Sequence, residues 1–212
     1  MFDQEPFSLN PVNFFAIACD CRYLPKKERF PPSAQYALPS THALTNEESF
    51  AKVAMGWNEE GIGLQIQVEQ AAGHSFYPKV EQGDSIELFI DTRDLKSAGF
   101  NTRFCHHFFF LPEAVEGVTS GEKTHFRTED SHPLCDSQDL ELQVQLRKKD
   151  YTMKIFIPSQ CLHGYDPKQF DRLGFTYRIN RYGDAPQHFA VISQEYQVDQ
   201  QPSLWSSIKL VK

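Results

Sequence analysis

Short segments in which apolar and polar residues alternate strictly are the feature that most limits the fold of this chain. The alternation is clear over residues 64–69 (LQIQVE) and returns at 84–91, 140–146 and 174–180. A period of two is typical of a β-strand with one buried face, whereas an amphipathic helix has a period near 3.6 residues. Because no long stretch shows the helical period, the chain is predicted to be all-β.

We expect about ten short strands joined mainly by turns, which favours an antiparallel two-sheet β-sandwich of the jelly-roll type over an α/β enzyme. The high content of aromatic residues, with 18 Phe and 8 Tyr, agrees with strands. A helical turn is expected at 159–163 and a long loop at 112–138. The expected strands are 14–18, 53–55, 64–69, 84–91, 103–111, 140–146, 151–157, 174–180, 189–193 and 207–211.

The 212 residues correspond to about one domain. Residues 1–50 are rich in proline, which fixes φ and removes a hydrogen-bond donor, so little regular structure is expected there beyond one early strand. We therefore predict an irregular Pro-rich N-terminal extension over 1–50 that packs on the sandwich. The β-sandwich domain itself is expected over 51–212, and the two parts form one folded unit.

Charge and composition exclude some partners. There are 21 Lys and Arg against 28 Asp and Glu, a net charge of −7, which argues against nucleic acid as a partner. No apolar run approaches about 18 residues, so no membrane partner is expected. The first residues are acidic and interrupted by proline, and the five cysteines are irregularly spaced. We expect no signal peptide, five reduced cysteines and a cytoplasmic protein.

Four stretches are similar to the family 9 carbohydrate-binding modules and the wider DOMON-like sandwich superfamily. The most specific is 83–91 (GDSIELFID), and the others are 53–64, 151–158 with 174–180, and 202–210. Their order and spacing agree with the family over about residues 50–212. The resemblance implies a sandwich of the carbohydrate-binding-module type and a non-catalytic role in binding a small saccharide or a related polar ligand.

The resemblance also implies where a ligand would bind. The sugar-contacting glutamate of the family falls at Glu87, and its arginine falls loosely at Arg103 or Cys105, which share strand parity with His107. Polar residues of the later strand alternate away from buried neighbours and can line an exposed face: Thr176, Arg178 and Asn180. Two arginines, a carboxylate and an imidazole would suit an anionic or polyhydroxylated ligand.

The aromatic part of that site departs from the family. Sugar-binding members hold the ring between two tryptophans, but the corresponding regions here contain Tyr77 and Tyr196. Trp57 and Trp205 fall on positions that the family uses for packing. We therefore expect the two tyrosines to replace the tryptophans. The complete set of expected ligand-binding residues is Glu87, Arg103, His107, Arg178, Asn180, Tyr77 and Tyr196.

No catalytic residue, metal ligand or cofactor is assigned, and the chain is not expected to be an enzyme, since no phosphate loop, zinc-protease helix or nucleophile elbow is present. Two alternatives stay open. One is a protein-interaction sandwich without a small ligand, for which a protein partner would be needed. The other is a metal-binding enzyme that uses the His106/His107 strand, although adjacent residues of a strand point to opposite faces.

Further ligands for such a metal could come from His125, His132 or Cys135, which spacing alone cannot test. The acidic turn 91–94 could bind calcium through carboxylate oxygens, but a solvated turn is the better interpretation.

Overall fold

The computed structural model describes residues 17–212 except 33, 43–45 and 194–195. Strands dominate it, and among the described residues no helix is long and apolar enough to span a bilayer. The strands are β1 (Ala18–Tyr23), β2 (Ala51–Asn58), β3 (Gly61–Val68), β4 (Ser85–Asp91), β5 (Cys105–Val115), β6 (Val118–Glu122), β7 (Glu141–Leu146), β8 (Tyr151–Pro158), β9 (Arg172–Arg181), β10 (Asp184–His188) and β11 (Ser206–Val211). Single 3₁₀ turns are η1 (Ala34–Tyr36), η2 (Val80–Gln82), η3 (Ser137–Asp139), η4 (Ser159–Cys161), η5 (Val198–Gln200) and η6 (Pro202–Leu204).

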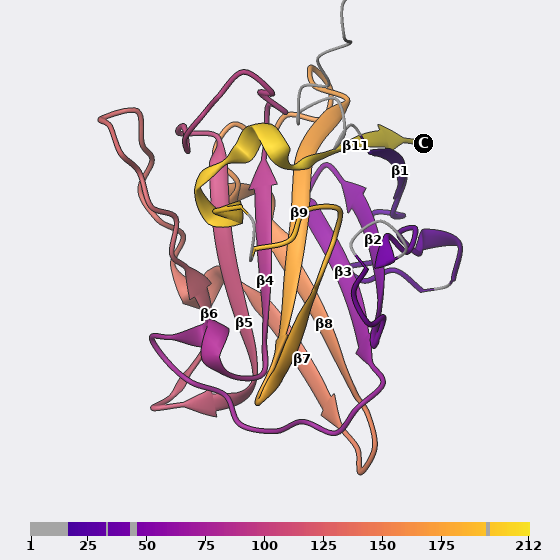
Figure 1. Ribbon diagram of the computed structural model, residues 1–212. Helices are drawn as coiled ribbons and strands as arrows, with labels where there is room; N and C mark the ends of the chain where they lie inside the picture. Colours follow the sequence, from indigo (N-terminus) through magenta and orange to yellow (C-terminus); the bar gives the residue numbers. More distant parts are fainter. Residues whose placement is uncertain (1–16, 33, 43–45, 194–195) are drawn as a thin grey trace, which may run out of the picture.

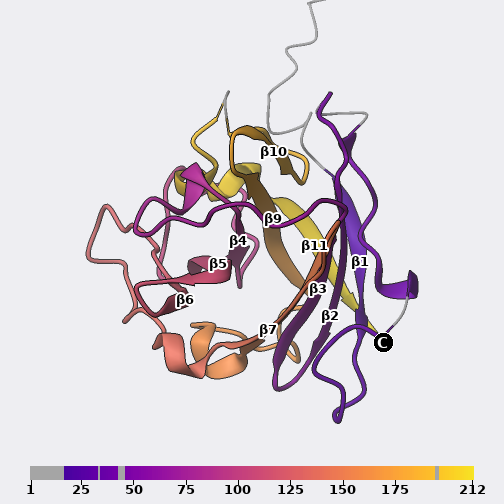
Figure 2. The ribbon, with the colours of Figure 1, turned by 90° about the horizontal axis from the view of Figure 1, so that it is seen from below.

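The strands form two facing layers. Hydrogen bonds connect them in the order β6-β5-β4-β9-β11-β1-β2-β3-β8-β7, with β10 paired to β9. Figure 1 shows β6, β5, β4 and β9 in front of β2, β3, β8 and β7, and the view from below in Figure 2 shows the sheet curving round from one layer to the other. The all-β prediction is confirmed, whereas the division into two separate sheets is not, because β11 and β1 join the layers.

Strand β1 links the two layers through parallel pairings on both sides. Its residue Cys21 is in register with Leu210 of β11, and Arg22 is in register with Gly56 of β2. The segment before residue 51, expected to be an irregular extension, therefore contributes a strand to the sheet. The predicted division of the chain into an extension over 1–50 and a sandwich over 51–212 stays a prediction, now with one strand of the sheet in the first part.

The core lies between the layers and uses one face of each strand. On β4 the inward residues are Ile86, Leu88 and Ile90, and all three are fully buried. They meet the inward residues of β3 and β8 in one continuous cluster. Because successive side chains of a strand point to opposite faces, Glu87 and Phe89 must lie on the outer face of the front layer.

Several expected elements are confirmed and some are shifted. The strands expected at 53–55 and 64–69 are β2 and β3, and η4 occupies the predicted helical turn at 159–163. The early strand predicted at 14–18 begins instead at Ala18, while residues 14–16 lie outside the described residues. The predicted loop 112–138 contains β6, and the strand predicted at 189–193 is replaced by β10 just before it.

The prediction of five reduced cysteines is wrong for one pair. A disulfide joins Cys135 to Cys161, whose Cα atoms are 5.0 Å apart, while Cys19, Cys21 and Cys105 are free. The bond connects the loop after β6 to η4 at the end of β8. Sequence spacing did not reveal it because 26 residues separate the two cysteines.

Candidate functional site

The carboxylate of Glu87 is the centre of a polar cluster on the outer face of the front layer. Strand β4 lies between β5 and β9, and its residue Glu87 is in register with Phe109 on one side and Arg178 on the other. Residues two positions apart share a face, so β5 also presents His107 and β9 also presents Asn180 toward Glu87. The structure thus brings together four of the seven expected ligand-binding residues.

Each oxygen of Glu87 has several donors. Oε1 accepts from His107 Nε2 at 2.9 Å, and Oε2 accepts from Arg178 Nε at 2.6 Å and Asn180 Nδ2 at 2.8 Å. Burial by itself raises the pKa of the Glu87 carboxyl. The hydrogen bond from His107 and the charge of Arg178 outweigh burial and hold this pKa well below its ordinary value, so the carboxylate stays ionised.

His107 is a neutral hydrogen-bond donor in this cluster. Burial lowers the pKa of its imidazole, although the hydrogen bond to Glu87 acts in the opposite direction. Since a carboxylate only accepts, Nε2 carries the proton. The two adjacent histidines point to opposite faces as expected. Both His106 and His107 are buried, so neither face of the strand leaves its histidine open to solvent.

Lys123 completes the cluster and was not predicted. Its Nζ lies 3.5 Å from Glu87 Oε1 and 3.9 Å from Glu81 Oε2. The side chains of Lys123 and Arg178 are 33% and 16% exposed, whereas that of Glu87 is fully buried. The two cations are therefore the parts of the cluster that reach solvent, and Glu87 holds them in place.

Exposed aromatic rings border the cluster on the side where β4 begins and β9 ends. Tyr77 is 42% exposed, and its ring centroid lies 5.7 Å from that of Phe109, the residue beside Glu87 on β5. Tyr182 is 53% exposed and follows Asn180 by two residues. Phe76, which is 38% exposed, packs against Tyr182 at 5.8 Å between centroids. Tyr182 was missed in the sequence, although its spacing from Asn180 was a usable signal.

Two expected ligand-binding residues lie elsewhere. Arg103 belongs to the turn before β5, where it forms an ion pair with Asp130 and does not belong to the described contacts of Glu87. Tyr196 packs against the cluster of Phe89 and Trp205, beside the site and not within the contacts of Glu87. Trp205 and Trp57 are buried, which confirms their expected packing role.

The acidic turn 91–94 uses its carboxylates for its own structure. Asp91 accepts hydrogen bonds from the backbone N–H groups of Arg93 and Leu95, and burial raises its pKa. Asp94 accepts from the Ser207 hydroxyl and pairs with Lys96. The interpretation as a solvated turn is wrong for Asp91, which is fully buried. Its carboxylate is a structural acceptor.

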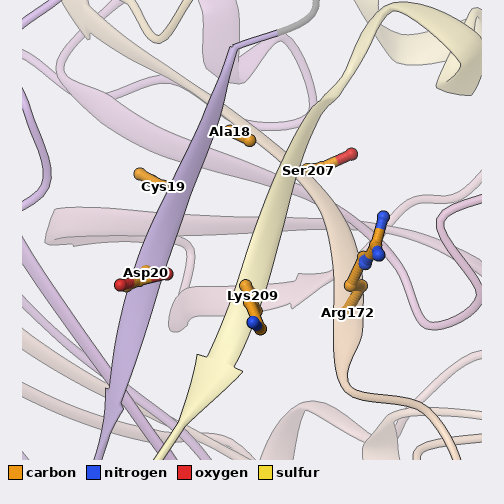
Figure 3. Close-up of a pocket in the computed structure, with 6 residues that line it drawn as sticks. All are labelled: Ala18, Cys19, Asp20, Arg172, Ser207 and Lys209. Carbon is orange, nitrogen blue, oxygen red and sulfur yellow. The ribbon is translucent and has the colours of Figure 1, made fainter.

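A shallow hollow lies at the other end of the same face, between β1, β11 and the start of β9. Figure 3 shows Asp20 on β1, Lys209 on β11 and Arg172 on β9 around it. Cys19 also borders the hollow, but its side chain packs against the core, and burial raises the pKa of its thiol to about 11. Such a thiol is protonated at neutral pH and is not a nucleophile. The hollow is distinct from the Glu87 cluster, which uses the far end of β9.

Comparison with known proteins identifies the fold. No protein-family model and no curated protein sequence matches the chain. Two solved structures of a family 9 carbohydrate-binding module from Caldicellulosiruptor kristjanssonii are similar to it. The complex with cellotriose has a TM-score of 0.62 at 15% identity and covers 92% of this chain and 93% of that one. The complex with glucose has a TM-score of 0.64 at 14% identity and covers 92% and 96%.

The chain therefore has the fold of the family 9 carbohydrate-binding modules. The resemblance found in its strand sequences is confirmed at the level of fold. With identities near 15%, the likeness extends to the architecture and leaves the ligand to be argued from the residues of this chain.

Proposed function

We propose that this chain is a non-catalytic binding module for a small saccharide, with the Glu87 cluster as its polar surface and Tyr77 and Tyr182 as its aromatic surface. One observation carries the proposal: a buried, ionised carboxylate orders two cations and an amide beside exposed aromatic rings. That combination matches the two needs of a sugar, donors and acceptors for its hydroxyl groups and a flat apolar surface for its C–H face.

The roles of the residues follow from their exposure. Arg178 and Lys123 reach solvent and can donate to saccharide hydroxyls, while Glu87 fixes their positions from below. A prearranged set of donors binds with a smaller loss of side-chain entropy than free surface residues would. Tyr182 and Tyr77 stand at the border of the cluster, where either ring can stack on the sugar.

Catalysis is not part of the proposal because Glu87 is a poor proton donor. Glycoside hydrolysis requires a carboxylic acid with a raised pKa and a second carboxylate across the glycosidic bond. The pKa of Glu87 is shifted in the opposite direction by Arg178 and His107. A saccharide held here would therefore be bound and not cleaved. The solved modules of the same fold were captured with cellotriose and glucose, which supports saccharides as the class to test.

The test is titration calorimetry of the purified chain with glucose, cellotriose and a wider panel of neutral and anionic oligosaccharides. We expect saturable binding by the unmodified protein. Tyr182→Ala and Tyr77→Ala should each weaken it by at least about tenfold, which corresponds to about 1.4 kcal/mol.

Phe100→Ala is the matched control, since Phe100 is 39% exposed and lies in the loop after β4, at the opposite end of that strand from Ser85. Its affinity should be unchanged. Absence of binding across the whole panel would refute the saccharide proposal. Binding that survives both tyrosine substitutions would place the site elsewhere on the molecule.

A further inference from the structure

A second cluster of ligand-type side chains lies behind the Glu87 cluster, on the inner face of β5 and β6. His106 on β5 and Glu122 on β6 point inward, whereas their neighbours His107 and Lys123 point outward. The loop after β6 brings His132 to the same place. Glu122 Oε1 lies 2.9 Å from His106 Nδ1 and 3.0 Å from His132 Nε2, and both histidines are buried.

The hydrogen bonds around His132 define where its proton lies. Nδ1 is 2.7 Å from the backbone carbonyl oxygen of Arg103, which can only accept, so Nδ1 carries the hydrogen. In a neutral ring, Nε2 then presents a lone pair to Glu122 Oε1, which already accepts from the Thr124 hydroxyl at 2.6 Å. This contact has two chemical solutions: a doubly protonated ring that donates from Nε2 to the carboxylate, or a neutral ring whose lone pair shares a bound cation with Glu122 Oε1.

His106 can supply a second lone pair. Its Nδ1 faces Glu122, and its buried Nε2 accepts no hydrogen bond from any of the described residues, so no contact of Nε2 forces the proton onto Nδ1. Two imidazole nitrogens and a carboxylate oxygen are ligands typical of zinc sites. Histidines that bind metals commonly donate their other N–H to a backbone carbonyl, as His132 does to Arg103.

The three ligand atoms lie within 4.8 Å of one another, and the two separations that involve Glu122 fit an ion after a small adjustment. Ligand atoms around a tetrahedral zinc ion lie about 3.3 Å apart, given bonds of about 2.0–2.1 Å. The separations of 2.9 and 3.0 Å to Glu122 Oε1 are within a few tenths of an ångström of that value. The Thr124 hydroxyl donates to Glu122 Oε1 at 2.6 Å and so helps to hold this carboxylate in place.

We propose that His106, Glu122 and His132 bind one divalent transition-metal ion of the zinc type. The ion has a structural role, because all three ligands are buried and it ties the loop after β6 to the β5–β6 hairpin. The same loop is held by the backbone N–H of Cys135, which donates to Glu122 Oε2 at 2.7 Å, and by the disulfide of Cys135.

The test measures metal binding directly, with no saccharide present. The full chain, freed of any purification tag, is dialysed with a weak chelator, and its metal content is determined by mass spectrometry. We expect about one equivalent of zinc per chain. Titration of the metal-free protein with Co²⁺ should produce the visible absorption bands of a tetrahedral site, and zinc should raise the melting temperature.

His132→Gln should abolish the stoichiometric zinc and the cobalt bands. His125→Gln is the matched control, because His125 is an exposed histidine of the same loop, and it should bind like the unmodified chain. Equal zinc in the unmodified chain and in His132→Gln would overturn the proposal, since the metal would then be bound elsewhere. So would an unmodified chain that takes up neither zinc nor cobalt, whether or not the variants fold. Because the site lies on the face opposite Glu87, neither result depends on saccharide binding.

Discussion

The charge of Glu87 depends on its neighbours, and this makes the stability of the protein depend on pH. In the folded chain its pKa is held well below the ordinary value, so folding favours the ionised form. Such a group contributes stability above its unfolded pKa, and the contribution is lost as pH falls through the folded pKa. Glu87→Gln leaves the partly buried Arg178 without its partner and should lower the free energy of unfolding by about 3 kcal/mol near neutral pH.

Urea denaturation of the unmodified chain and of Glu87→Gln at about pH 5 and about pH 3 measures this dependence. The stability difference between the two proteins should shrink on going to the lower pH. Glu113→Gln, which changes an exposed carboxylate of β5, should differ from the unmodified chain by less than about 0.5 kcal/mol. A Glu87→Gln difference that stays constant over this range would mean that folding does not lower the pKa of Glu87.

The residues of the site were predictable where they lie on alternating strands. The family resemblance pointed to Glu87 and to the polar residues of the later strand, and the period of two placed Glu87, Arg178 and Asn180 on one face. Lys123 was missed because it follows a short polar strand, β6, that has no apolar alternation. The contact between His132 and Glu122 could not be predicted either, because the path of a loop depends on tertiary contacts.

At the scale of elements, two glycines let the segment after β1 lie directly on the outer face of the β2–β3 hairpin. Gly56 and Gly63 are in register on β2 and β3, and a Cβ atom at either position would meet Leu24. At Gly63 the Cβ would also collide with the backbone carbonyl of Arg29. A backbone atom cannot move aside as a flexible side chain can, so the collision must displace the segment.

Gly63→Ala should therefore destabilise the protein by about 1–3 kcal/mol, the usual cost of overpacking. Gly99→Ala provides the comparison, because a Cβ at Gly99 would have no neighbour within 4 Å. Chemical denaturation of both variants against the unmodified chain gives the two values. Equal stability of Gly63→Ala and Gly99→Ala would show that the segment does not pack on the hairpin in solution.

Strands whose sequences alternate between apolar and polar residues were the elements predicted well, including β3, β4, β7 and β9. Strand β1 was displaced because its sequence, ACDCRY, has no clear alternation and its burial pattern is correspondingly irregular. Its parallel partners, β2 and β11, are distant in the chain, and parallel pairing leaves no turn signal between neighbours. The closure of the two layers into one sheet could therefore not be predicted.

At the scale of the whole molecule, one covalent bond holds the front layer to the back layer. The disulfide joins the loop that follows β6 in the front layer to η4, which follows β8 in the back layer. Disulfides persist mainly in oxidising compartments, so this bond removes one of the two reasons for expecting a cytoplasmic protein. Spacing along the chain could not identify the pair, because connectivity depends on which loops the fold brings together.

The disulfide predicts a thiol count that can be measured. Protein purified without reductant and unfolded in guanidinium should react with a thiol reagent at Cys19, Cys21 and Cys105 only, and at all five cysteines after reduction. Cys161→Ser should release Cys135 for reaction.

For cysteines 26 residues apart, loss of the bond should lower the free energy of unfolding by about 3 kcal/mol, because the unfolded chain gains loop entropy. Cys105→Ser keeps the disulfide and is the matched comparison. Its free energy of unfolding should differ between the oxidised and reduced forms by the same amount as in the unmodified chain. Five reactive thiols in the unreduced protein would show that Cys135 and Cys161 are not joined, and the two layers would then be held by packing and hydrogen bonds alone.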